Sequence, residues 1–324
     1  MFRQSVLRLA LGASAALATA SASLAQSAPW PDKPVKLVLP YAPGGATDLI
    51  ARPWTDVLAK AFNQQFVLEH RGGAGAMIGA ELVSKAAPDG YTFLFTPNAP
   101  LSVQPNLRKT PYDPIKSFMA VARVGDSLAG FTIHPSVGIK TFQEMIDYAK
   151  KNPGKLMFGS AGLGTGTHLR IEMLKYKAGI DILHVPYRGS ADALNDLLAG
   201  TIHMMTEINV LPHVKAGKLI LLNVNNASRH PEFPDVPTLT ELGYPNSDVP
   251  IWFSLWAPAG TPPEIITRLN AKIVEIAKTE EMKQRLFAIH VAVPIQTPEE
   301  MGRFLVEDIA RNAEVIKAAN VKLE

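Results

Sequence analysis

The sequence predicts an α/β protein with two similar lobes and a ligand cleft between them. Short apolar runs alternate with amphipathic helical stretches, which is typical of mainly parallel sheets covered by helices on both faces. A unit of strand, glycine-rich loop and helix occurs at residues 35–62 and again at 156–174. Because ligands of open α/β sheets bind beyond the carboxyl ends of the strands, two facing lobes would place both loops in one cleft.

In the first third of the chain, strands and helices follow each other closely. The apolar run at residues 35–39 predicts a buried strand, and a helix is expected to begin near Leu49 with Ile50, Trp54 and Leu58 on one face. By the same patterns we expect a strand at 66–68, a helix at 80–86 and a strand at 91–96.

The remaining elements are predicted from helix-start signals and short apolar runs. Thr141 and Glu144 form a capping box that begins a helix ending near Lys151. Two further capping boxes, each followed by proline, are predicted to begin long C-terminal helices at 261–264 and 297–300. Strands are expected at 156–158, 182–185, 202–206 and 219–224, and a helix at 191–198.

Composition excludes several classes of protein. Of the 324 residues, 47% are hydrophobic and 19% are charged, which indicates a folded globular chain. The formal net charge is +3 without any basic block, so no nucleic-acid partner is expected. The absence of cysteine excludes disulfides, thiolate catalysis and cysteine-based metal sites.

The N-terminus has the pattern of an export signal. Arg3 and Arg8 precede an apolar stretch at 9–20, and small residues lead to an expected cleavage site after Ala25. The apolar stretch is shorter than the ~20 residues that a spanning helix needs. We therefore expect residues 1–25 to be a signal peptide and the mature protein to be periplasmic.

The first glycine-rich loop has the features of an anion site. Gly44 and Gly45 let a ligand approach the main chain, and the following helix start presents unpaired N–H groups and partial positive charge. Thr47 would add a hydroxyl donor, whereas Asp48 is either a helix cap or a contact to a polar ligand group. The alternative is a tight strand-to-helix turn that binds no ligand.

The second glycine-rich loop, at residues 160–168, resembles the first. Its glycines at 162 and 164 are followed by Thr167, so the spacing does not match a dinucleotide-binding fingerprint. The surrounding residues do not form a nucleophile elbow either. His168 is either a donor to a carboxylate or an ordinary residue of a helix start.

Two further loops follow predicted strands. Tyr187 offers an apolar face with a hydroxyl, and Arg188 is the best candidate for a charged contact to an acid. The alternative is that Arg188 is a solvated arginine on a loop. In the other loop, Asn209 would hydrogen-bond a ligand, and Glu207 would bond a ligand hydroxyl or orient Arg188. The eight histidines show no metal-ligand spacing, so we expect neither a metal nor a cofactor.

Over nearly all of the mature chain, the sequence resembles the receptors of the tripartite tricarboxylate transporters, also called Bug-type receptors. The resemblance is carried by PDKPVKLVLPYAPGGATDLIAR, HRGGAGAMIGAELVSKAAPDGYTFLF, PYDPIKSF, NPGKLMFGSAGLGTGTHLRIEML, ILHVPYRGSADALNDLLAG, KAGKL, PDVPTLTELG and APAGTPPEIITRLN. It implies a type II periplasmic-binding-protein fold, a small organic carboxylate as ligand and the membrane subunits of a secondary transporter as partners. Position 207 is Glu where the family pattern has Asp, which leaves the identity of the ligand open.

With the resemblance, the lobes are expected at residues 29–128 plus 250–324 and at 129–249. The expected function is a transport receptor and not an enzyme, because no nucleophile, base and orienting group can be assembled from the motifs. The alternatives are an exported hydrolase and a sensor for a separate signalling protein. The expected ligand-binding residues are Tyr41, Pro43, Gly44, Gly45, Ala46, Thr47, Asp48, Asn98, Ser160, Ala161, Gly162, Thr165, Gly166, Thr167, His168, Tyr187, Arg188, Gly189, Glu207 and Asn209.

Overall fold

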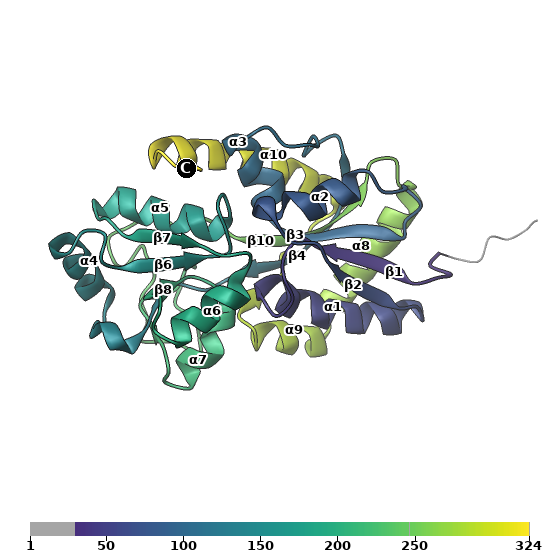
Figure 1. The fold of residues 1–324 in the computed structure, drawn as a ribbon. Helices are drawn as coiled ribbons and strands as arrows, with labels where there is room; N and C mark the ends of the chain where they lie inside the picture. The colour runs from purple at the N-terminus through teal and green to yellow at the C-terminus, as the bar shows by residue number, and fades with distance from the viewer. Residues whose placement is uncertain (1–29, 246, 324) are drawn as a thin grey trace, which may run out of the picture. The chain divides into compact units, whose positions relative to one another are not determined.

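The computed structural model of the chain describes residues 30–245 and 247–323. The predicted signal peptide therefore lies outside the described residues. Residues 33–324 form one unit, which contains two separate β-sheets (Figure 1).

The first sheet is mixed. Its strands have the order β11-β4-β10-β3-β1-β2, and β1 runs parallel to both β2 and β3. β10 is antiparallel to β3 and β4, so the prediction of a mainly parallel sheet is wrong here. β4 and β10 were not predicted, although every residue of β10 is buried. The bounds are β1 (Val35–Leu39), β2 (Phe66–His70), β3 (Thr92–Pro97), β4 (Phe118–Ser127), β10 (Trp252–Pro258) and β11 (Val291–Ala292).

Helices from both ends of the chain cover this sheet. Figure 1 shows α2 and α10 over one face and α1 and α9 over the other. Met77 and Val83 of α2 and Met301 and Leu305 of α10 share a buried core with strand residues such as Leu94. The bounds are α1 (Ala46–Phe62), α2 (Met77–Ser84), α3 (Gln104–Leu107), α8 (Pro263–Ala277), α9 (Glu280–Phe287) and α10 (Pro298–Ala318).

The second sheet has the order β7-β6-β8-β5-β9, with β6 parallel to β7 and β8 and with β5 antiparallel to its neighbours. Phe131, Phe158 and Ile171 belong to its buried core. The strands predicted at 202–206 and 219–224 are shorter than expected. The bounds are β5 (Thr132–Ile133), β6 (Met157–Ser160), β7 (Leu183–Pro186), β8 (Met204–Met205), β9 (Ile220–Leu221), α4 (Phe142–Lys151), α5 (Gly166–Ala178), α6 (Ser190–Leu198) and α7 (Leu211–Lys215).

Two of the three predicted capping boxes are present. Thr141 and Thr297 each accept a bond from the third helical N–H, and the glutamates at those positions bond back. The box predicted at Thr261 is wrong, because Pro262 is the N-cap and the Thr261 hydroxyl donates to the Pro258 carbonyl at 2.8 Å. None of the helices within the described residues is long and apolar enough to cross a membrane.

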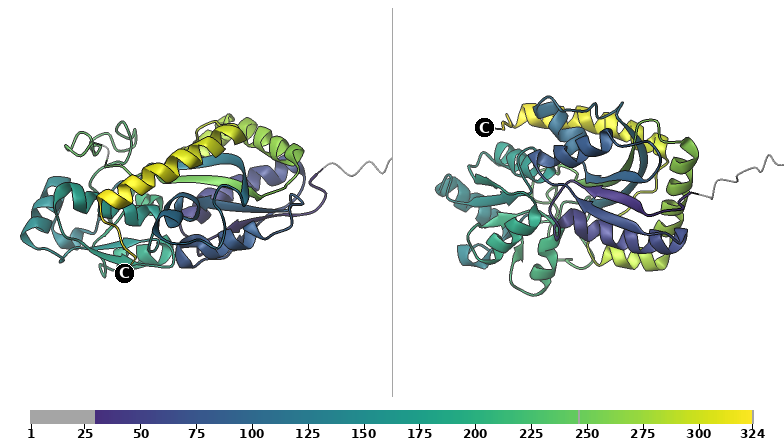
Figure 2. Two further views of the ribbon diagram at one scale, coloured as in Figure 1. Left: turned by 90° about the horizontal axis from the view of Figure 1, so that it is seen from above. Right: turned by 45° about the vertical axis from the view of Figure 1, so that its right-hand side comes forward.

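The chain crosses between the sheets in the segments between β4 and β5 and before β10. Arg170, a fully buried residue of α5, holds both crossing segments: it donates to the Val249 carbonyl at 2.8 Å and to the Ala129 carbonyl at 3.1 Å. The long helix α10, yellow in Figure 2, extends from the first sheet to α5, and Val321, which follows the helix, belongs to the same buried cluster as Met173 of α5. These contacts connect the two lobes, which lie on either side of one cleft.

Candidate functional site

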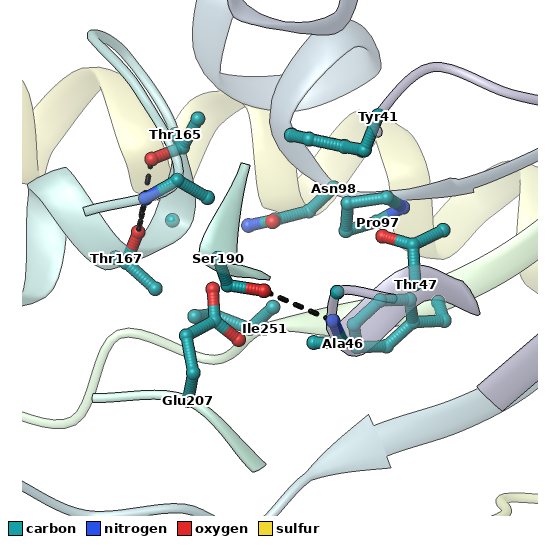
Figure 3. Close-up of a pocket in the computed structure, with 14 residues that line it drawn as sticks. Tyr41, Ala46, Thr47, Pro97, Asn98, Thr165, Thr167, Ser190, Glu207 and Ile251 are labelled. Atoms are coloured by element: carbon teal, nitrogen blue, oxygen red, sulfur yellow. Dashed lines mark hydrogen bonds between the residues drawn. The ribbon is translucent and has the colours of Figure 1, made fainter. Parts of the chain in front are cut away.

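A small cavity lies between the two lobes, at the carboxyl ends of β1 and β6. It leaves about 20 Å³ open to the centre of a water-sized sphere, which is room for roughly one water molecule. The residues that line it are Tyr41, Gly45, Ala46, Thr47, Pro97, Asn98, Ala161, Thr165, Gly166, Thr167, Ser190, Glu207, Ile251 and Phe253 (Figure 3). None of them is a lysine, arginine or histidine, so no cationic side chain is in position to contact a ligand in the cavity directly.

The first wall is the start of α1. Gly44 has a φ of +79°, which glycine adopts without strain, and Gly45 is the N-cap with an ordinary φ of −85°. The Ala46 N–H donates across the cleft to the Ser190 hydroxyl at 2.9 Å, as Figure 3 shows. Since Ser190 is the first residue of α6, this bond joins the two lobes directly.

The opposite wall is the start of α5. The Thr165 hydroxyl donates to the Gly162 carbonyl at 2.7 Å and caps the helix by accepting from the His168 N–H. The Thr167 hydroxyl accepts from the Ala161 N–H at 3.1 Å. The N-termini of α1, a helix of 17 residues, and of α5, a helix of 13 residues, thus face one small space. Both present unpaired N–H groups and partial positive charge.

Asn98 contributes a buried polar group without a partner. Its side-chain amide donates to the Pro250 carbonyl at 3.2 Å, but its Oδ1 atom is buried and accepts no hydrogen bond from any residue that the structure describes. Buried amide oxygens are rarely left unpaired, so this atom is suited to accept a bond from a ligand hydroxyl or from a water.

Within residues 30–245 and 247–323, Glu207 is the only carboxylate that lines the cavity. Its side chain is almost fully buried and points into the space between the loops (Figure 3). Burial raises the pKa of Glu207 to about 7, and the positive charge of Arg170 opposes this only in part. Burial and then the charge of Glu207 raise the pKa of Tyr41 on the facing wall, so the Tyr41 hydroxyl stays protonated.

The cavity brings together part of the predicted set. The predicted residues that line it are Tyr41, Gly45, Ala46, Thr47, Asn98, Ala161, Thr165, Gly166, Thr167 and Glu207. The predicted residues that do not line it are Pro43, Gly44, Asp48, Ser160, Gly162, His168, Tyr187, Arg188, Gly189 and Asn209.

Asp48 lies behind the loop. Its carboxylate accepts from the Gly44 N–H at 3.1 Å, from Arg52 at 2.8 Å and from His70 at 2.8 Å. Although burial opposes the shift, the bonds from Arg52, Gly44 and His70 hold the pKa of Asp48 below its ordinary value. Of the two roles considered, the geometry supports the structural one, in which Asp48 fixes the loop and the start of α1.

His168 also supports a loop. Its Nδ1 atom accepts from the Gly164 N–H at 3.1 Å, and its ring stacks on His184 with centroids 4.1 Å apart. Burial, followed by the proximity of His184, lowers the pKa of His168 to about 3, so the ring is neutral at pH 7. Ser160 contacts the same pair, with its hydroxyl 2.6 Å from His184 Nε2.

The remaining predicted side chains have other partners or other surroundings. The Tyr187 hydroxyl donates to Asp196 at 2.6 Å, and the Asn209 amide donates to the Ser190 carbonyl at 3.0 Å. Arg188 is exposed and lines a second pocket beside the cleft.

Sequence reasoning missed four lining residues. Ile251 directly precedes β10, Phe253 is the second residue of β10, and Pro97 ends β3. Ser190 carried a usable signal, since a serine directly before a predicted helix is a typical helix-start residue.

A histidine cluster lies elsewhere in the fold and was also missed. His230, Glu232 and His290 bring one ligand-type atom each within 4.8 Å of one another. The Glu232 N–H donates to His230 Nδ1 at 3.1 Å, which leaves His230 Nε2 as the protonated nitrogen of a neutral ring, 3.2 Å from His290 Nδ1. His290 Nε2 in turn lies 3.2 Å from Glu232. His230, Glu232 and His290 are thus joined by a closed set of hydrogen bonds.

Two α/β lobes that enclose a small cleft define the class of type II periplasmic binding proteins. The chain belongs to the tripartite tricarboxylate transporter receptor family, because the family model "Tripartite tricarboxylate transporter family receptor" matches residues 50–321.

Relatives and solved structures resemble about nine tenths of the chain. It is 35% identical to the Bordetella pertussis protein BugT over 300 residues, which is 91% of this chain and 92% of BugT. An R. palustris protein solved with adipate has a TM-score of 0.87 at 32% identity and covers 90% of this chain and 99% of its own. MatC from Rhodopseudomonas palustris, with bound malate, has a TM-score of 0.84 at 30% identity and covers 89% and 100%.

Proposed function

We propose that this protein is a periplasmic receptor that captures a small organic carboxylate and delivers it to the membrane subunits of a tripartite tricarboxylate-type transporter. The observation that carries the proposal is the cavity between the N-termini of α1 and α5, which no cationic side chain lines. Backbone N–H groups and helix dipoles at such a point stabilise an anion. The solved relatives bound to adipate and malate support a carboxylate as the ligand.

The proposed contacts follow from the lining residues. The carboxylate is held by N–H groups at the starts of α1 and α5, with the Thr47 hydroxyl as an additional donor. Each helix end contributes roughly 0.3–1 kcal/mol, and up to ~2 kcal/mol when partly buried. Glu207 and Asn98 face the rest of the ligand.

We also propose that the protein is a receptor and not an enzyme. The Ser160–His184 contact is the arrangement that a hydrolase would need, but Ser160 is fully buried and does not line the cleft. Burial lowers the pKa of His184 to about 4, so this ring is a weak base. Release of acid from a bound ester or amide would favour the hydrolase alternative.

The proposed location is the periplasm, after removal of residues 1–25. The periplasmic binding protein BugD, a solved structure with a TM-score of 0.86 at 32% identity, supports this location. The intact mass of the exported protein tests it, and a mass that still includes residues 1–25 would contradict the proposed cleavage.

We expect a small carboxylate to stabilise the purified protein against heat. A ligand at 100 times its Kd adds about 2.7 kcal/mol to the free energy of unfolding. Thermal unfolding is measured with a panel of mono-, di- and tricarboxylates, and the matched neutral amides serve as controls. A panel in which no carboxylate raises Tm above its amide would refute the proposed function.

We also propose that the lobes are residues 29–128 plus 250–324 and residues 129–249, and that they close over the ligand as a hinge. Solution scattering is expected to show a smaller radius of gyration for the monomer at ligand saturation. An unchanged radius, together with a large radius in the ligand-free protein, would contradict closure.

A further inference from the structure

A further pocket lies where the segment that crosses from β4 to β5 meets α9 and β11. It is lined by Leu128 and by residues from 226–231, 277–287 and 291–295, and we call it the α9 pocket. It leaves about 670 Å³ open to the centre of a water-sized sphere, compared with about 20 Å³ in the cleft cavity. The two spaces share no lining residue, so the α9 pocket is a separate site.

Both proposed lobes build the walls of the α9 pocket. Residues 226–231 form one side, and the ends of α8 and α9 and the segment around β11 form the other. The closed set of hydrogen bonds among His230, Glu232 and His290 joins the two sides, and both imidazole rings are buried. These bonds hold the walls at a fixed separation, which is typical of small-molecule sites that are formed in advance of binding.

The lining of the α9 pocket is largely apolar, and two of its large side chains are left exposed. Leu128, Leu286 and Val291 contribute buried apolar groups, whereas Phe287 is 45% exposed and Ile295 is 47% exposed. Exposed apolar side chains that gather in one hollow mark a ligand groove or an interaction site more often than scattered ones do. An occupant with an apolar chain would remove Phe287 and Ile295 from water.

The polar groups of the α9 pocket carry more positive than negative charge. Lys278 and Lys283 line it, and neither forms an ion pair with a residue that the structure describes. Arg229 is already paired with Glu241 at 3.0 Å. Glu280 supplies the single carboxylate of the lining among the described residues. Two ammonium groups therefore remain available to an anionic head group, and a compact ammonium charge accepts anions of different geometry.

We propose that the α9 pocket is a second ligand site, which binds an amphipathic anion with a hydrocarbon chain and one charged head group. The chain lies against Phe287 and Ile295, and the head group lies beside Lys278 and Lys283. The site is independent of the cleft and takes a different class of ligand, because its lining is apolar where the cleft presents two helix starts. A protein segment seated in the groove is the other occupant that the experiment must distinguish.

Calorimetric titration of a protein whose cleft is blocked tests this inference. Gly45→Val blocks the cleft, since a Cβ atom at this position would lie 2.9 Å from the Ser190 hydroxyl. The wild type with its cleft saturated by a small carboxylate gives a second measurement that does not depend on this variant. The probes are butanoate, hexanoate and octanoate, with octanamide as the neutral match of octanoate. Affinity is expected to rise roughly three- to fourfold for each added CH₂, and octanamide should bind at least about fivefold more weakly than octanoate.

Two sets of variants in the same cleft-blocked proteins separate the head group from the chain. Lys278→Gln combined with Lys283→Gln should abolish the preference for octanoate over octanamide. Ile295→Ser should weaken both probes alike, by roughly 5- to 10-fold. The matched controls remove exposed side chains that do not line the α9 pocket and should leave both affinities unchanged. They are Lys60→Gln combined with Lys317→Gln, and Val306→Ser. Thermal unfolding confirms that each variant folds.

Three results would overturn the inference. Octanoate binds neither cleft-blocked protein, which would leave the groove to a protein segment or to no occupant. Octanoate and octanamide bind equally, which would mean that the lysines recognise no head group. The control variants weaken octanoate as much as the pocket variants do, which would place the probe elsewhere on the surface. The proposed function is tested separately by small carboxylates in the open cleft, so its failure and the failure of this inference can be told apart.

Discussion

Replacing Gly45 with valine is expected to weaken carboxylate binding by roughly 100-fold, the upper range for forcing extra atoms into a packed contact. A Cβ atom at this position would lie 2.9 Å from the Ser190 hydroxyl and 3.7 Å from the Ala191 backbone nitrogen. The branched side chain therefore holds α6 away from the start of α1. It prevents the closed cleft from forming and covers the N–H groups that would meet the ligand.

The folded state itself should tolerate the change. Because φ at Gly45 is −85°, valine fits the backbone, so the left-handed conformation is not the reason for glycine here. Urea unfolding of the ligand-free variant should stay near the wild type. Gly302→Val is the control, since a Cβ atom at that site on α10 meets nothing within 4 Å.

Two further variants compare the contributions of the Thr47 hydroxyl and of Arg188 to the affinity with that of the backbone at Gly45. Thr47→Ala removes one hydroxyl and should weaken binding only about 2- to 10-fold. Arg188→Gln should weaken monocarboxylate binding little. If Gly45→Val binds like the wild type while Arg188→Gln abolishes binding, recognition depends on a side-chain ion pair and not on the backbone of the two helix starts.

Carboxylate affinity is expected to fall about tenfold for each pH unit above pH 7, because one proton must then be taken up on binding. Burial raises the pKa of Glu207 to about 7 in the ligand-binding cleft. A bound carboxylate raises this pKa further, so the complex contains protonated Glu207. Below pH 7 the proton is already present and the affinity becomes independent of pH; above pH 7 the protein must acquire it.

The charged and titratable groups that face Glu207 are Arg170 from α5 and Tyr41 at the end of β1. Arg170 is positively charged throughout this range, and the raised pKa of Tyr41 keeps its hydroxyl neutral. Glu207 is therefore the group in the cleft that titrates near pH 7.

Calorimetry in buffers of different ionisation enthalpy measures the proton uptake. Glu207→Gln imitates the protonated carboxyl and should bind with little dependence on pH, whereas Glu264→Gln, an exposed residue of α8, should behave like the wild type. An affinity that rises with pH, together with weak binding by Glu207→Gln, would show that ionised Glu207 accepts a bond from a ligand donor.

Local patterns predicted much of the fold. The run at 35–39, the glycine pair that follows it and the helix after it were all recognisable, although α1 begins at Ala46, three residues before the expected start. The apolar, aromatic-rich run WFSLWAP carried the local signal of a buried strand, although β10 was not predicted. Its antiparallel pairing with β3 and β4 could not be predicted locally, because these strands lie more than 100 residues earlier in the chain.

The sequence by itself determined that two glycine-rich loops precede helices and are suited to bind an anion. Backbone freedom and the polarity of a helix start are properties of a few adjacent residues, so local sequence is enough to predict them. Which polar side chains meet the ligand space was decided only by the tertiary structure. Packing of the lobes brings Ser190 to Ala46 and buries Glu207, whereas it leaves Arg188 in the neighbouring pocket. Burial and long-range contacts depend on residues far apart in the chain, and the same burial raises the pKa of Glu207 into the physiological range.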